Sequence, residues 1–92
     1  MPVEVKIPAL LRNHVGGSKS VTAAPGTLKD VLLALSRDYP GLGDQFFSDS
    51  GDLHRFVNVY VNDEDVRYLS KLETPVSEGD VVAILPAVAG GA

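Results

Sequence analysis

Only one stretch of this 92-residue chain has the apolar spacing of a long helix, and short alternating segments lie on both sides of it. In the stretch 28–39 the apolar residues recur every three or four positions, which places them on one helical face. Thr27 is a predicted N-cap, with Asp30 three residues later as its acidic partner. Pro40 and Gly41 end the pattern. Because one helix cannot enclose a core by itself, the remaining segments must supply a sheet.

Three segments alternate between apolar and other residues, which is the pattern of strands with one buried face. They cover residues 3–7, 56–61 and 81–85. In the last of them we expect Val82 and Ile84 to point inward and Leu85 to point outward. A returning strand is expected at 18–23, after a turn that contains two glycines. A short pairing strand is expected at 66–68, after a solvated acidic turn at 62–65.

This order of elements predicts an α+β fold with a mixed sheet of four or five strands and one main helix. The first and last strands would lie side by side and parallel in the centre of the sheet, with the helix packed across them. That is the β-grasp, or ubiquitin-like, arrangement. We expect residues 1–86 to form this domain and residues 87–92 to form a flexible C-terminal Gly-Gly tail.

Composition excludes several functions. The net charge is −4 with only eight Lys and Arg, so a nucleic-acid partner is not expected. No segment has the length of a membrane span, and the charged, alternating start is not a signal peptide, so a cytoplasmic location is expected. The protein alone is expected to be a monomer. The two histidines, His14 and His54, lack metal-ligand spacing, so no metal site is predicted. Because the chain has no cysteine, disulfides and thiolate nucleophiles are excluded, and the terminal carboxyl is the remaining covalent handle.

The C-terminal segment carries a specific pattern. Glu78–Pro86 (Glu-Gly-Asp-Val-Val-Ala-Ile-Leu-Pro), together with Val88-Ala89-Gly90-Gly91, resembles the C-terminus of the MoaD/ThiS family of ubiquitin-like sulfur carriers. Within that family, the segment 53–67 looks most similar to CysO-type carriers. The resemblance covers nearly the whole chain, including the opening strand, the helix and the pair Val61-Asn62.

The resemblance implies a carrier that is not itself an enzyme and binds no cofactor. An E1-like adenylyltransferase/sulfurtransferase would use ATP to adenylate the carboxyl group of Gly91, and a sulfur donor would convert it to a thiocarboxylate. A sulfur-accepting biosynthetic enzyme would then take the sulfur. The products favoured are cysteine or a thiosugar, while a thioquinoline-like metabolite and molybdopterin stay open.

For this chemistry the tail must be long enough to enter the active site of the partner, and its side chains must be small. Fully extended, the five residues 87–91 would span roughly 17 Å. Val88, Ala89 and Gly90 would occupy a narrow tunnel of the partner, since glycine lets backbone groups approach closely. In relatives, outward sheet-face positions contact the E1-like enzyme. The matching residues here are Pro8 and Leu85, with Arg12 at the rim and Phe56, Tyr60 and Val81 as extensions.

Ala92 follows the expected reactive residue, and three explanations are open. A processing peptidase, such as a metalloprotease, could remove it. It could be a residue added in cloning, or one that deliberately blocks the tail. Or the partner could accept an alanine carboxylate.

The function also has alternatives. The same activated tail would suit a ubiquitin-like modifier of lysines or a molybdopterin synthase small subunit, and the fold would suit a plain binding module.

Overall fold

The computed structural model describes residues 2–54 and 57–86 of the chain. Twelve short elements follow one another in this part. They are β1 (Val3–Lys6), η1 (Ala9–Val15), β2 (Ser20–Ala23), β3 (Gly26–Thr27), α1 (Leu28–Asp38), α2 (Gly43–Phe46), β4 (Val57–Val61), β5 (Glu64–Asp65), η2 (Val66–Tyr68), η3 (Lys71–Glu73), β6 (Pro75–Val76) and β7 (Val81–Pro86). The predicted tail at 87–92 and the predicted contact Phe56 lie outside the described residues.

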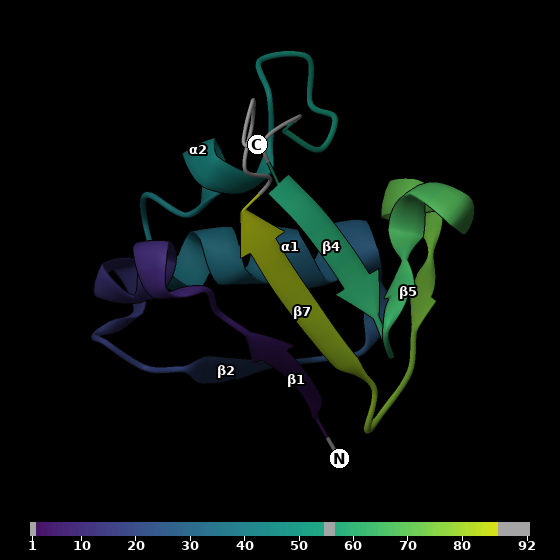
Figure 1. Ribbon diagram of the computed structural model, residues 1–92, viewed down its shortest axis with the longest axis horizontal. Helices are drawn as coiled ribbons and strands as arrows, with labels where there is room; N and C mark the ends of the chain where they lie inside the picture. The colour runs from purple at the N-terminus through teal and green to yellow at the C-terminus, as the bar shows by residue number, and fades with distance from the viewer. Residues whose placement is uncertain (1, 55–56, 87–92) are drawn as a thin grey trace.

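The main sheet has five strands in the order β2-β1-β7-β4-β5. β1 and β7 are parallel, with Val5 opposite Val82, and the other neighbours are antiparallel. Figure 1 looks onto this sheet with α1 lying behind it. No described helix covers the face turned to the viewer. The β-grasp prediction is therefore confirmed, including the parallel pairing of the first and last strands.

The core lies between the sheet and α1. Val3, Val5 and Ile7 of the opening segment are buried, as are Val82 and Ile84 of β7. From the helix, Leu28, Val31, Leu32 and Leu35 pack against them, each with no exposed area. These residues are those that the periodic patterns placed inward, because period 2 and period 3.6 each select one face.

The start of α1 is fixed by a capping box. The backbone N–H of Asp30 donates to the Thr27 hydroxyl (3.1 Å), and the Thr27 N–H donates to the Asp30 carboxylate (3.2 Å). These two bonds satisfy amides that have no partner inside the helix. The helix ends at Asp38, just before the predicted Pro40-Gly41 stop.

Three local features of the structure were not predicted from the sequence. The connection after β1 is not a plain turn, because Ala9–Val15 forms the 3₁₀ helix η1 before the glycines. The short helix α2 follows the main helix, and its Phe46 and the preceding Leu42 are fully buried. Gly26–Thr27 and Pro75–Val76 also pair as a separate two-stranded sheet. Each is a short element held by tertiary contacts, for which periodicity gives no signal.

The expected strand at 66–68 is wrong. Asn62 and Asp63 both have positive φ (49° and 70°), so they alone form the turn and the return strand starts at Glu64. Residues 66–68 form the 3₁₀ helix η2 instead. Two consecutive residues with positive φ are the signature of the tight hairpin turns that asparagine and aspartate favour.

Asp63 and Glu64 are exposed, as expected for a solvated acidic turn. Asp65 differs, because its side chain is only 8% exposed and its carboxylate accepts from the backbone N–H (2.9 Å) and Nη2 (2.8 Å) of Arg67. These hydrogen bonds, first the one from the Arg67 side chain, lower the pKa of Asp65.

Among the described helices, none is long and apolar enough to cross a membrane.

Candidate functional site

The C-terminal end of β7 lies beside the end of β1, and β7 is the last described element before the predicted tail. The parallel register sets Lys6 opposite Ala83, so the residues that follow each of them continue side by side. Pro8, two residues after Lys6, precedes η1 as its N-cap residue. Leu85, two residues after Ala83, is 46% exposed. Residues more than 70 positions apart in the sequence are thus brought to one surface.

A shallow groove of about 480 Å³ lies at this place, here named the Leu85 groove. All three predicted partner-contact residues, Pro8, Arg12 and Leu85, line it. The complete lining consists of Glu4, Lys6, Ile7, Pro8, Arg12, Lys19, Ser20, Ala83, Ile84 and Leu85. Within the groove, the apolar side chains of Pro8 and Leu85 are accompanied by charged and polar ones.

Arg12 is held in the groove by the fold of η1. The 3₁₀ helix begins directly after Pro8, with the Leu11 N–H donating to the Pro8 carbonyl (2.9 Å). This turns Arg12 back over the end of β1, where its Nε donates to the carbonyl of Ile7 (3.1 Å). The helix ends at Val15, and the next residue, Gly16, has a φ of 68° that favours glycine. The Gly17 N–H then donates to the Arg12 carbonyl (2.7 Å).

The other end of β7 is fixed by Asn62. The Val81 N–H donates to Oδ1 of Asn62 (3.0 Å), and the Asn62 N–H donates to the Val81 carbonyl (2.8 Å). Just before Val81, the Asp80 carboxylate accepts from the Ser77 N–H (2.8 Å). That bond and the Asn62 side-chain amide lower the pKa of Asp80. The strand that leads to the tail is therefore anchored at its start as well as by its two neighbours.

The remaining predicted contacts do not line the Leu85 groove. Tyr60 pairs with Ala83 and Val81 pairs with Glu4, so both lie farther along the open sheet face, half-buried. The tail positions Val88, Ala89, Gly90, Gly91 and Ala92 lie outside the described residues.

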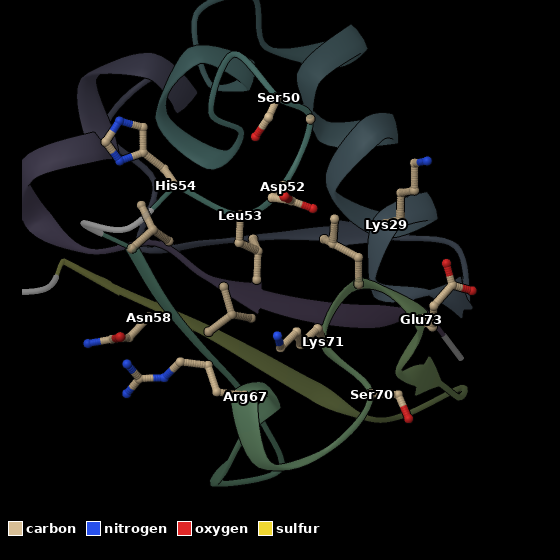
Figure 2. A pocket seen from close by; sticks show the side chains of 14 residues that line it. Lys29, Ser50, Asp52, Leu53, His54, Asn58, Arg67, Ser70, Lys71 and Glu73 are labelled. Atoms are coloured by element: carbon tan, nitrogen blue, oxygen red, sulfur yellow. The ribbon is translucent and has the colours of Figure 1, made fainter.

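A larger cavity of about 840 Å³ lies at the other side of β4. Figure 2 shows charged side chains of both signs around this cavity: Lys29 and Lys71 are positive, and Asp52 and Glu73 are negative. His54 also lines it, whereas His14 lies against Gly41 elsewhere. Within residues 2–54 and 57–86, no group of three or more His, Asp or Glu is placed to hold a metal ion.

Comparison with known proteins connects this geometry to a family. The sequence matches the ThiS family over residues 5–91. It is 53% identical to the sulfur carrier protein CysO of Mycobacterium tuberculosis, over 99% of this chain and 100% of that protein. It is also 35% identical to small archaeal modifier protein 3 of Haloferax volcanii, again over 99% of this chain and 100% of that protein.

The fold gives the same result. The structure superimposes on a chain of the Amycolatopsis orientalis BexX/CysO complex with a TM-score of 0.89 and 47% identity, covering 97% of this chain and 99% of that one. A shared fold alone would not establish a function. Here the family match and the full-length identity add to it, and the chain belongs to the ThiS family as a CysO-type sulfur carrier protein, not an enzyme.

Proposed function

We propose that the carboxyl group of Gly91 is the sulfur-carrying group of this protein and that Ala92 must first be removed. The absence of cysteine supports this, because no side-chain thiol can hold the sulfur. The family match supports it as well, since it extends through Gly91 and leaves Ala92 outside. A methyl side chain on the last residue would hinder entry into a tunnel shaped for glycine.

The chemistry follows from the poor reactivity of a carboxylate toward nucleophiles. In the proposed sequence, a carboxylate oxygen of Gly91 attacks the α-phosphorus of ATP and pyrophosphate leaves. The sulfur of sulfide or a persulfide then attacks the acyl carbon and AMP leaves with the bridging oxygen. A thiocarboxylate results when sulfide attacks; with a persulfide, a second thiol must reduce the resulting acyl disulfide. An E1-like adenylyltransferase/sulfurtransferase supplies the catalytic groups and ATP, and the carrier supplies the tail.

The described residues contribute the surface that would present this tail. Leu85 and Pro86 end β7 directly before residue 87, and Pro8 and Arg12 lie beside Leu85 in the same groove. We infer that the activating enzyme contacts this groove while the tail enters its active site. A sulfur-accepting biosynthetic enzyme completes the cycle, with cysteine or another sulfur-containing metabolite as the product.

One comparison separates these assignments. The full-length chain and a chain ending at Gly91 are each incubated with the activating enzyme, ATP and sulfide, and the intact masses are measured. The shortened chain is expected to exchange one oxygen for sulfur, and the full-length chain is expected to stay unchanged. Equal thiocarboxylate formation from both would overturn the need for processing.

A second candidate function is conjugation to lysines. It is favoured by the identity to the archaeal modifier protein, and it begins from the same acyl adenylate. Adding a lysine-containing protein to the incubation distinguishes the two functions, because a modifier yields a covalent isopeptide adduct, whereas a dedicated carrier yields only the thiocarboxylate.

A further inference from the structure

Positive charge gathers in the Leu85 groove although the chain as a whole is acidic. Lys6, Arg12 and Lys19 line the groove together with a single carboxylate, that of Glu4. The rest of the sequence holds the other five Lys and Arg and the other eleven Asp and Glu. The groove is therefore a cationic site on a strongly anionic molecule.

The two lysines are exposed and available. Lys6 stands on β1 between Ser20 of β2 and Ala83 of β7, so its side chain shares the open face with the outward residues of β7. Lys19 is held at the end of β1 by the Ile7 N–H, which donates to its carbonyl (2.8 Å). Neither ammonium group has an ion-pair partner among the described residues. Both can therefore respond to charge on an approaching molecule.

Arg12 is placed differently. Its Nε bond to the Ile7 carbonyl fixes the guanidinium plane and uses one of five donors. Its two terminal amino groups bond to no residue in the part of the chain that the structure describes. A guanidinium fixed in this way can donate two parallel hydrogen bonds to a carboxylate, at a lower entropy cost than a free side chain.

The larger cavity in Figure 2 provides a contrast within the same molecule. There Lys29 and Lys71 are balanced by Asp52 and Glu73, and Arg67 is already bonded to Asp65. The larger cavity therefore has no excess of positive charge. The Leu85 groove is smaller, yet it combines an apolar centre with an unbalanced cationic rim.

We propose that the partner seated in the Leu85 groove is the activating enzyme and that it presents an apolar projection ringed by carboxylates. This inference rests on the proposed function, which requires such an enzyme next to the end of β7. The apolar projection would cover Pro8 and Leu85, and the carboxylates would face Lys6, Lys19 and Arg12. Opposite charges around an interface steer encounter and fix orientation more than they add affinity.

The test reverses the two rim charges in a chain that ends at Gly91. In the double variant Lys6→Glu/Lys19→Glu, kcat/KM for pyrophosphate release by the activating enzyme is expected to fall roughly tenfold at low ionic strength. The loss should shrink strongly at high salt, because salt screens exposed charges. The kcat at saturating carrier should stay at the wild-type value, because the tail is unchanged.

The matched control is Lys29→Glu/Lys71→Glu, which makes the same change of charge beside the other cavity and should leave kcat/KM near the wild-type value. The neutral double variant Lys6→Gln/Lys19→Gln should show a smaller loss than the reversed one, and thermal unfolding verifies that each variant folds. Equal losses in the two reversed pairs, or no loss from the Lys6/Lys19 pair at low salt, would overturn the docking inference. Because wild-type activation is measured in the same assay, such a result leaves the proposed function standing.

Discussion

Asn62 and Val81 exchange two hydrogen bonds, one through the Asn62 backbone and one through its side chain, and these join the turn after β4 to the start of β7. Asn62 does this with a φ of 49°, a conformation that asparagine adopts more readily than most residues. The central strand of the sheet is thereby fixed at the end opposite the Leu85 groove.

We expect Asn62→Gly to lower the free energy of unfolding by about 1–3 kcal/mol, because the Val81 N–H and Asp80 lose a side-chain partner. Glycine keeps the positive φ, so the backbone is not strained. The control is Asp63→Gly, at a φ of 70° in the same turn, where no side-chain hydrogen bond is lost among the described residues. Urea denaturation measures both; similar losses in the two variants would show that the turn conformation, not the hydrogen bond, carries the effect.

Stability should decline in acid partly through Asp80 and Asp65. Hydrogen bonds to the charged carboxylates hold both pKa values below the ordinary value in the folded state. A depressed folded pKa gives stability that is present above the unfolded value, about 4, and is lost as the pH falls through the folded pKa.

The variants Asp80→Asn and Asp65→Asn should therefore be less stable than the wild type at neutral pH, with a flatter decline below about pH 4. Urea denaturation across pH 2–7 checks the slopes. An acid decline that is unchanged in both variants would show that other carboxylates account for it.

Two adjacent leucines of α1 test the packing of the core. Leu32 has no exposed area, whereas Leu33 is 43% exposed. Leu32→Ala should lower the free energy of unfolding by about 2–5 kcal/mol, through lost apolar burial and the cavity left behind. Leu33→Ala removes the same atoms from a partly exposed side chain and should stay within about 0.5 kcal/mol. Equal effects would contradict the assignment of the buried face.

Leu85 is expected to matter for partner binding more than for stability. Leu85→Ala removes the apolar centre of its groove and should weaken productive binding by more than about 1 kcal/mol, seen as a higher KM for the activating enzyme. Its matched control is Leu10→Ala, since Leu10 is 74% exposed and does not line the groove. A KM that rises equally in both variants would argue against the groove as the contact surface.

The long strands and the main helix could be predicted from the sequence because their apolar residues recur at regular spacing. Alternation placed Val3, Val5, Val82 and Ile84 inward, and the helical spacing of 28–39 selected the buried face of α1. Thr27 and Asp30 also indicated where the helix starts, because a capping box consists of two residues at a fixed spacing.

The short elements could not be predicted in the same way. The strands β3 and β6 have two residues each, and η1 is a 3₁₀ helix with no apolar period of its own, held in part by the Arg12–Ile7 hydrogen bond. The strand expected at 66–68 was displaced because the positive φ of Asn62 and Asp63 shortened the turn to two residues. Asn–Asp is a weaker signal for such a turn than Asn–Gly.

Part of the candidate site could be predicted from the sequence and part could not. Family resemblance selected Pro8, Arg12 and Leu85, and the structure brings all three to one groove. Lys6 and Lys19 carried no signal in the sequence, because a single lysine on an exposed position is ordinary. Their significance comes only from the register of β1 with β2 and β7, which gathers them with Arg12 on one surface.

The most direct test of the central claim, that Gly91 carries the sulfur, is the intact mass of the protein isolated from its own cells. The predicted result is a chain that ends at Gly91 and has one oxygen replaced by sulfur, with the change located by fragmentation to the terminal carboxyl group. An unaltered chain that retains Ala92, or a chain found only as high-mass conjugates on lysines, would contradict it.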